Sequence, residues 1–340
     1  METASTVLIV SASIGAGHDG TAAEIGRRLQ TAGAPVRRLD FLDLLPAGWG
    51  QTLKQAYARQ LAHAPATWGW LLAAAARPGA TRSAARLSAT AARRRLLDAV
   101  GPATAVISTY PLASQALGRL RLAGLLRVPA IAVLTDPSVH PLCVARGIDL
   151  HVTQNPEATA VVETVHGLPA ITLPPFVHPA FRPAAGAPDV LAARRTHGLP
   201  PDARLALVVA GSWGVGDVEA TVRDLAVAGA AIPVVVCGTN TALRDRLAAG
   251  GDAITFGWVD DMATLLRAVD LVVQNAGGLT CAEALATGVP VISYRCLPGH
   301  GVANAAVLSR LGLAEWPLTA AALAAAVALR TGGPLPKVAP

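Results

Sequence analysis

Short apolar runs of valine, isoleucine, leucine and alanine recur along the whole chain and constrain its fold more than any other feature. Longer stretches rich in alanine, leucine and arginine separate them. Continuous apolar runs between helices are typical of parallel strands that are covered on both faces. The sequence therefore predicts an α/β protein, with strands at 7–10, 105–107, 130–134, 205–209, 233–236, 271–273 and 289–292.

A proline-rich passage divides these runs into two groups. Its prolines are Pro174, Pro175, Pro179, Pro183 and Pro188, and a new strand–loop–helix pattern follows them. A length of 340 residues suits two domains. We expect two doubly wound Rossmann-like domains that face a cleft. The predicted parts are an N-terminal domain at 1–178, a linker at 179–190, a C-terminal domain at 191–330 and a tail at 331–340.

A helical insert is expected in the first domain, at about 49–100. It brings tryptophans and leucines next to clustered arginines, a combination that suits a surface lying on anionic lipid. Core-facing helices with a solvated basic side fit the pattern equally well. The residues are Trp49, Trp68, Trp70, Leu71 and Leu72 with Arg77, Arg82, Arg86, Arg93, Arg94 and Arg95.

Charge and composition exclude several classes of protein. The formal net charge is +6, and its basic side is almost all arginine, because lysine occurs only as Lys54 and Lys337. Aromatic residues make up 4% of the chain and do not alternate with the arginines, so a nucleic-acid partner is not expected.

Cysteine spacing and hydropathy bear on metal binding, disulfide formation and cellular location. The four cysteines lie far apart and no Asp-x-Asp pair occurs, so neither a disulfide framework nor a metal site is expected. The apolar stretches are shorter than the roughly 20 residues that a membrane span needs. The first residues carry no basic segment of a signal peptide. We therefore expect a cytoplasmic protein.

A glycine-rich turn follows the first predicted strand, with a helix expected from about residue 22. Gly15, Gly17 and Gly20 would let the backbone approach a ligand closely. Their spacing fits the dinucleotide fingerprint only formally, with Asp40 about twenty residues on, and a lone match of this kind does not define a dinucleotide site. His18 is the distinctive residue, because it would point into the cleft and titrate near neutral pH. We single out His18 as a catalytic candidate; a structural histidine is the alternative.

Asp136 follows the strand predicted at 130–134. A carboxylate at the end of a strand could orient an imidazole or accept a proton from an attacking hydroxyl. An aspartate that caps the loop before Pro137 is the alternative.

The strongest cluster follows the strand at 271–273. Gly277, Gly278, Leu279 and Thr280 form a turn into a helix, where backbone N–H groups and the Thr280 hydroxyl suit a phosphate or diphosphate. Glu283 lies about one turn further on, where a carboxylate accepts hydrogen bonds from a ribose diol. This division of tasks indicates a nucleotide.

A second glycine-rich loop follows the strand at 205–209. It consists of Gly211, Ser212, Trp213 and Gly214 and suits the same diphosphate. Either loop alone would be weak, but two of them in one domain favour a nucleotide site.

These motifs resemble the monogalactosyldiacylglycerol synthase and processive diacylglycerol glucosyltransferase family, which is related to the peptidoglycan N-acetylglucosaminyltransferases. The resemblance covers nearly the whole chain in the family's order. It rests on Gly277-Gly278-Leu279-Thr280-x-x-Glu283-Ala284, Gly288-Val289-Pro290, Pro298-Gly299-His300 with Asn304, Gly15-x-Gly17-His18, Thr135-Asp136 with His140, Gly238-x-Asn240 and Gly257-Trp258-Val259.

The resemblance implies an inverting glycosyltransferase of the GT-B type, which moves a hexose from a UDP-sugar to a lipid such as diacylglycerol. It places the diphosphate at Gly277–Thr280 and Gly211–Gly214, the ribose at Glu283, and the uracil at the backbone near Val259. Further implied assignments are His300 and Asn304 at the sugar, Gly15, Gly17 and His140 in the acceptor loops, and His18 and Asp136 as catalytic residues.

It also implies no metal and no cofactor besides the donor substrate, and it favours the reading of the insert as a peripheral contact with the cytoplasmic face of the membrane.

One motif departs from the family. Where the family usually reads Pro-Gly-Gln-Glu, this chain reads Pro298-Gly299-His300-Gly301. An amide and a carboxylate that would bind sugar hydroxyls are thus missing. Alternatives are transfer to a polyprenyl or soluble acceptor, a sugar-nucleotide epimerase, and a degenerate nucleotide-sugar-binding protein that transfers nothing.

Overall fold

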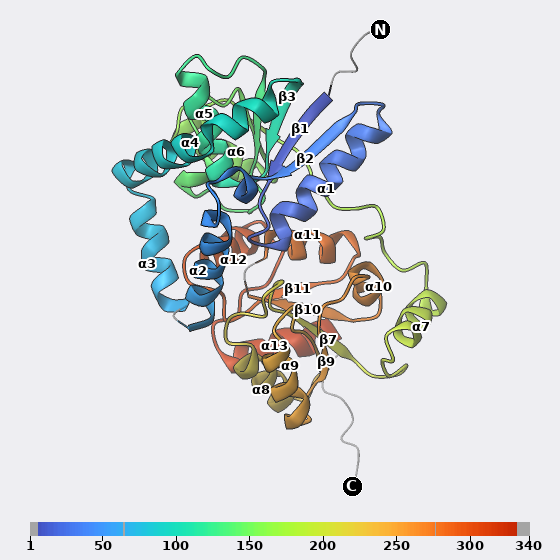
Figure 1. Cartoon of the computed structure of the whole chain (residues 1–340). Coiled ribbons are helices and arrows are strands. Elements are labelled where there is room, and N and C mark those ends of the chain that lie inside the picture. The colour runs from blue at the N-terminus through green and yellow to red at the C-terminus, as the bar shows by residue number, and fades with distance from the viewer. Residues whose placement is uncertain (1–5, 64, 276, 332–340) are drawn as a thin grey trace. The chain divides into compact units, whose positions relative to one another are not determined.

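The computed structural model describes residues 6–331 except residues 64 and 276. The chain forms two compact units, Met1–Phe176 and Val177–Pro340. Each unit is built on one parallel sheet with helices between the strands, as the alternating pattern predicts. Figure 1 colours the first unit blue to green and the second yellow-green to red.

The first unit holds a six-stranded sheet in the order β2-β1-β3-β4-β5-β6. The strand order reverses between β1 and β3, and ligands of open parallel sheets bind at such a switch point, beyond the carboxyl ends of the strands. The strands are β1 (Thr6–Ser11), β2 (Val36–Asp40), β3 (Ala103–Ser108), β4 (Ala130–Val133), β5 (Leu150–Thr153) and β6 (Ala170–Thr172).

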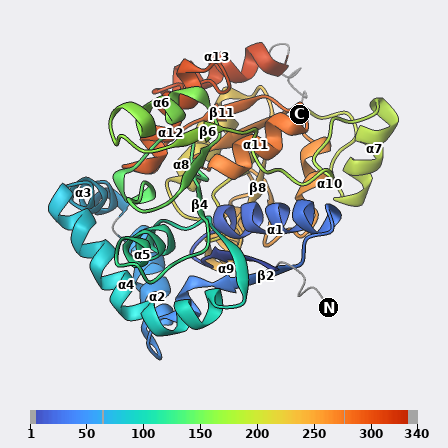
Figure 2. The same ribbon diagram turned by 90° about the horizontal axis from the view of Figure 1, so that it is seen from above.

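Helices cover both faces of this sheet (Figure 2). Leu8 and Val10 of β1 pack in one core with α4 (Pro78–Val100) and α5 (Pro111–Leu122). Ile9, between them, packs in another core with α1 (Ala16–Thr31). Because both faces of the strand are buried, its sequence is a continuous apolar run rather than an alternating one. The short helix α6 (Pro156–Thr164) lies between β5 and β6.

The expected start of the first helix is wrong. α1 begins at Ala16 rather than near residue 22, and Gly15 is its N-cap in an extended conformation. His18 therefore lies in the first turn of α1 and not in the preceding loop. Two glycines near the start of the helix made the turn appear longer in the sequence than it is.

The insert consists of α2 (Trp49–His63), α3 (Pro65–Ala75) and α4. The two alternatives for the insert, an exposed surface for lipid and core-facing helices, apply to different parts of it. The second half of α4 faces the core, with Ala89, Ala92 and Leu96 buried. Trp49 at the start of α2 is 62% exposed, Trp70 on α3 is 69% exposed, and Leu87 on α4 is 71% exposed. The Trp68 side chain lies outside the described set. Within the described residues no helix is long and apolar enough to cross a membrane.

The second unit holds a five-stranded sheet in the order β11-β10-β7-β8-β9. Its switch point lies between β7 and β10. The strands are β7 (Leu205–Val209), β8 (Ile232–Val236), β9 (Ile254–Phe256), β10 (Leu271–Gln274) and β11 (Val291–Ser293). The helices are α7 (Ala187–Thr196), α8 (Val218–Ala228), α9 (Thr241–Gly250), α10 (Met262–Arg267), α11 (Gly278–Ala286), α12 (His300–Arg310) and α13 (Ala320–Thr331).

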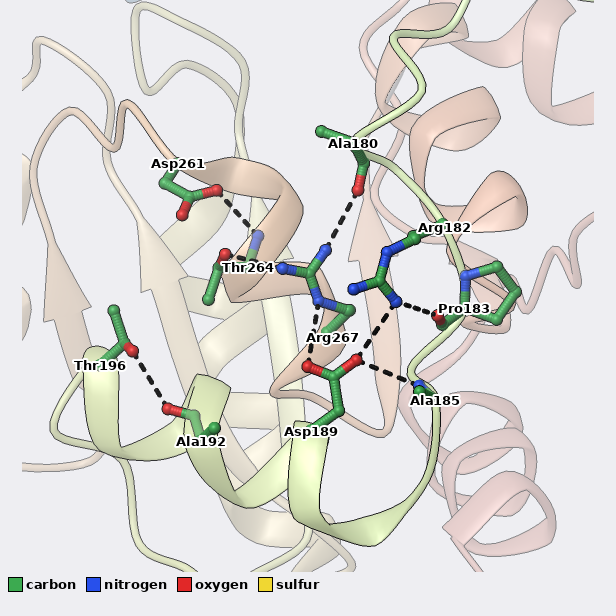
Figure 3. A network of polar contacts seen from close by, with 10 residues as sticks. All are labelled: Ala180, Arg182, Pro183, Ala185, Asp189, Ala192, Thr196, Asp261, Thr264 and Arg267. Carbon is green, nitrogen blue, oxygen red and sulfur yellow. Dashed lines mark hydrogen bonds and ion pairs between the residues drawn. The ribbon is translucent and has the colours of Figure 1, made fainter.

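The whole of the predicted linker at 179–190 belongs to the second unit. Its last residues are helical, because α7 begins at Ala187. Asp189 accepts hydrogen bonds from the Ala185 N–H at 3.0 Å and from Arg182 at 3.3 Å, and Arg267 of α10 lies 3.9 Å from the same carboxylate (Figure 3). Arg267 also donates to the Ala180 carbonyl at 3.1 Å. This network fixes the segment to α10, so prolines alone do not define a linker here. The tail beyond residue 331 lies outside the described residues.

Candidate functional site

His18 lies at the switch point of the first unit, where α1 begins beside the carboxyl end of β3. Its Nδ1 is 2.7 Å from the Thr109 carbonyl oxygen and 3.2 Å from the Thr135 hydroxyl. A carbonyl oxygen only accepts hydrogen bonds, so Nδ1 carries the hydrogen and Nε2 is the basic nitrogen of the neutral ring. The ring also meets the Tyr110 ring edge-on, with 5.5 Å between the two ring centroids. These contacts fix the tautomer and the orientation of the imidazole.

The loop between β1 and α1 is anchored by side chains from other elements. The Ser13 N–H donates to Asp40 at 3.1 Å, and the Ser13 hydroxyl is 3.3 Å from Nζ of Lys54 on α2. Asp19, next to His18 in sequence, accepts a hydrogen bond from Ser11 at 2.6 Å. No role was assigned to Lys54 from the sequence, although its being one of two lysines in the chain was a signal. The first helix of the insert thus touches the glycine-rich loop.

Asp136 lies directly after Thr135, and its charge reaches two neighbouring groups. Burial raises the pKa of Tyr57 on α2, and the negative charge of Asp136 raises it further. Burial also raises the pKa of Cys143 to about 12, again with a contribution from Asp136. The ring of His18 is held by Thr109 and Thr135, so a direct role of Asp136 in orienting it stays a prediction.

His140 connects the loop after β4 with the insert. Its Nδ1 accepts from the Leu142 N–H at 3.2 Å, and its Nε2 lies 3.0 Å from the Leu72 carbonyl of α3. Both ring nitrogens therefore bond to the backbone. In this structure His140 anchors the loop; its predicted place beside an acceptor stays a prediction.

In the second unit, the loop after β7 depends on glycine. Gly211, Gly214 and Gly216 have φ angles of +70°, +55° and +100°, a region that side-chain-bearing residues rarely adopt. A Cβ on Gly214 would lie 2.3 Å from the Cys237 carbonyl oxygen. The loop thus packs directly against the end of β8, which explains the spacing of its glycines.

The loops after β7, β8 and β10 are joined by hydrogen bonds at the carboxyl ends of these strands. The Ser212 carbonyl accepts from the Thr239 N–H at 2.9 Å, and Asn240 donates to the Gly214 carbonyl at 3.0 Å. Asn275, after β10, donates to the Val215 carbonyl at 2.6 Å. Backbone groups from loops far apart in sequence are therefore held together at the switch point between β7 and β10. The sequence contained Asn275 but gave no reason to assign it this bridging role.

The predicted anion site lies at the start of α11. Gly277 is the N-cap and the helix begins at Gly278, so the N–H groups of its first turn point toward the switch point. Glu283 is half-buried on this helix, and burial raises its pKa to about 7. Among the described residues no group forms an ion pair or a hydrogen bond with its carboxylate. A half-buried carboxyl that has no hydrogen-bond partner among the described residues favours a ligand that supplies donors.

The remaining predicted residues differ in exposure. Val259 is half-buried after β9, next to Trp258, which is 56% exposed. His300 is half-buried as the first residue of α12, but Asn304 is only 1% exposed. The role of Asn304 at the sugar stays a prediction. Within the described residues no group of His, Cys, Asp and Glu has the arrangement of a metal site.

Solved structures define the class of fold. MurG of Acinetobacter baumannii matches with a TM-score of 0.54 and 18% identity, over 95% of this chain and 89% of that protein. The glycosyltransferase of kitacinnamycin matches with a TM-score of 0.60 and 16% identity, over 96% of this chain and 90% of that protein. The chain has the GT-B fold of these glycosyltransferases. More specifically, residues 205–321 match the model of the glycosyltransferase family 28 C-terminal domain.

Curated relatives agree with this assignment. The processive diacylglycerol beta-glucosyltransferase of Bacillus thuringiensis (strain Al Hakam) is 30% identical over 221 residues, which cover 62% of this chain and 55% of the relative. The protein of the same name in Bacillus subtilis (strain 168) is 29% identical over 209 residues, or 59% of this chain and 53% of the relative. The chain thus spans about half the length of these relatives. The resemblance derived from the motifs is confirmed.

Proposed function

We propose that this protein is an inverting glycosyltransferase that moves a hexose from a UDP-sugar to a lipid acceptor such as diacylglycerol. The observation that carries the proposal is the held imidazole of His18 at the switch point of the first unit. The Thr109 carbonyl at 2.7 Å from Nδ1 leaves Nε2 as the basic nitrogen. The name of the curated relatives, processive diacylglycerol beta-glucosyltransferase, supports the transfer of a hexose to diacylglycerol.

In the proposed reaction, His18 accepts the proton of the acceptor hydroxyl as its oxygen attacks the anomeric carbon. The bond from that carbon to the diphosphate oxygen breaks on the opposite face, so the configuration inverts and UDP leaves. The N–H groups at the start of α11 stabilise the charge on the leaving diphosphate. Donor recognition is assigned to the second unit, with Gly211–Gly214 and Gly277–Thr280 at the diphosphate, Glu283 at the ribose, Val259 at the uracil, and His300 and Asn304 at the sugar.

The insert supports a peripheral contact with an anionic membrane on the cytoplasmic side. Trp70 and Leu71 of α3 are 69% and 38% exposed, and Arg77, Arg82 and Arg86 are exposed nearby in sequence. Aromatic and basic side chains together suit the interface of an anionic bilayer. We assign the membrane-facing part to α3 and the first half of α4, since the rest of α4 packs into the core.

Radiolabelled UDP-glucose, UDP-galactose and UDP-N-acetylglucosamine, each incubated with the protein and a total lipid extract, test the proposal. Label from one donor in a diacylglycerol-based glycolipid is the expected result. Label only in polyprenyl or aqueous products would move the acceptor to another class. UDP binding without any product would favour the degenerate binding protein.

A further inference from the structure

Arg295 adopts an unusual backbone conformation next to the proposed donor site. Its φ angle is +45°, and it is the only non-glycine residue with a positive φ in the described part of the chain. Such conformations persist only where the surroundings hold them, and they concentrate at functional sites. Arg295 lies just after β11 and shortly before Pro298, Gly299 and His300.

Two carboxylates of α8 and its N-cap hold the guanidinium. Nη1 of Arg295 lies 2.5 Å from Asp217, and Nη2 and Nε lie 2.8 and 3.0 Å from Asp224. The Tyr294 hydroxyl donates to the same Asp224 carboxylate at 2.9 Å. Burial acts to raise the pKa of Asp224, but the hydrogen bonds from Arg295 and Tyr294 outweigh it, and the pKa lies below its usual value. Asp224 is therefore a well-stabilised anchor.

Backbone hydrogen bonds fix both sides of Arg295. The Tyr294 N–H donates to the Gln274 carbonyl at 2.9 Å, and the Leu297 N–H donates to the Asn275 carbonyl at 2.8 Å. Asp217, at the other end of the clamp, directly follows the glycine-rich loop at 211–216. Arg295 thus connects the loop after β11 with the loop after β7, and the loop after β10 is bonded to both.

We propose that Arg295 is a positioning residue of the donor site. Its clamp on Asp217 and Asp224 holds the turn that leads to His300 against the glycine-rich loop after β7. The proposal rests on the proposed function, because it assumes that these loops receive a nucleoside diphosphate sugar. A preformed set of loops binds such a ligand more tightly, since less ordering accompanies binding.

A second ion pair on the same helix provides a matched control. Arg246 of α9 contacts Glu219 of α8 at 2.8 Å, with both side chains about half exposed. This pair does not involve the loop after β11. Arg246→Ala removes a positive charge and an ion pair of α8 without releasing the proposed clamp.

Calorimetric titration with UDP, together with thermal unfolding, tests the proposal. Arg295→Ala removes the clamp and keeps the unfavourable φ, whereas Arg295→Gly removes the clamp and relieves the strain. Both variants are expected to weaken UDP binding about tenfold. Arg295→Gly should unfold at a higher temperature than Arg295→Ala, because it relieves the strain. Asp224→Asn should weaken binding similarly, with no further loss in the double variant Arg295→Ala/Asp224→Asn. Arg246→Ala should bind like the wild type.

The outcomes separate the two proposals. If the wild type binds no UDP, the proposed function and this inference both fail. If the wild type binds UDP and the Arg295 and Asp224 variants bind it equally well, only the role of Arg295 is overturned. UDP affinity that recovers with thermal stability in Arg295→Gly would reduce Arg295 to a structural residue. If Arg295→Ala does not fold, Arg295→Gly and Asp224→Asn decide.

Discussion

Both units place a glycine-rich turn at the switch point of a parallel sheet, but different groups surround the two turns. In the first unit the turn is lined by titratable side chains, among them His18, Asp40 and Lys54. In the second unit backbone groups dominate, and Glu283 is the notable titratable group. The proposed function assigns proton transfer to the turn of the first unit and ligand binding to the turn of the second, and this difference between their surroundings supports that division.

The largest expected effect of this difference concerns His18. His18→Ala should lower the rate of glycosyl transfer by roughly 10²–10⁴-fold, the usual contribution of a positioned general base. The measurement is the turnover of UDP-sugar with lipid at saturating donor. His166→Ala, which changes another histidine of the same unit, should leave turnover unchanged. Equal transfer rates in His18→Ala and His166→Ala would show that His18 takes no part in the reaction.

Gly214 tests the importance of the glycine-rich loop after β7 in the second unit. Gly214→Ala should reduce the free energy of unfolding by about 2–4 kcal/mol and weaken UDP binding, because the new Cβ meets the Cys237 carbonyl and φ is +55°. Gly229→Ala is the matched control, since its φ is +63° and no atom lies within 4 Å of the added Cβ. It should cost about 1 kcal/mol, from the backbone alone. If Gly214→Ala and Gly229→Ala lower the free energy of unfolding by similar amounts, the close packing of this loop is unimportant.

Glu283 gives a prediction about pH. Burial keeps its carboxyl protonated up to about pH 7 in the folded chain, whereas its ordinary value is 4.5. The folded state therefore binds more protons between these values, and the free energy of unfolding decreases as the pH rises through this window. Glu283→Gln should match the wild type near pH 4.5 and exceed its stability by about 1–3 kcal/mol at pH 8.

Denaturant titrations at several pH values measure this difference. Glu163→Gln, at an exposed glutamate, should follow the wild type throughout. A constant offset between Glu283→Gln and the wild type at all pH values would mean that the carboxyl is not held neutral.

Lys54 carries the smallest expected effect. Lys54→Met removes the contact at 3.3 Å between α2 and Ser13, so transfer should fall by tenfold or less, a factor typical of a partly exposed polar contact. UDP binding should not change, and Lys54→Arg should restore most of the activity. Arg59→Met, on the same helix, controls for the lost charge. Weaker UDP binding in Lys54→Met would contradict the separation of the two sites.

The sequence predicted those parts of the fold that depend on burial. Strands with apolar side chains on both faces, such as β1 and β7, were recognised from their composition. β2 was missed because it includes Arg37 and Arg38, and its sheet position at an edge tolerates exposed side chains. β5 was missed because His151 interrupts its apolar run. β6 and β9 were missed because each has 3 residues, one of them a threonine, whereas the equally short β11 was recognised from the apolar run at 289–292.

The candidate site was predicted where glycine and titratable residues share one motif. Contacts over long sequence distances were not visible, such as that between His18 and Thr109 or the clamp of Arg295 on α8. These contacts depend on the order of strands in the sheets, which local sequence patterns do not specify. Lys54 belongs to the same group, because only the packing of the insert brings it to Ser13.

The central claim is that the first unit supplies the chemistry and the second unit binds the nucleotide. Titration of UDP into His18→Ala, compared with the wild type, tests it most directly. We predict the same UDP affinity in a variant that no longer transfers sugar. A large loss of UDP affinity in His18→Ala would contradict the account, because it would make His18 part of the donor site.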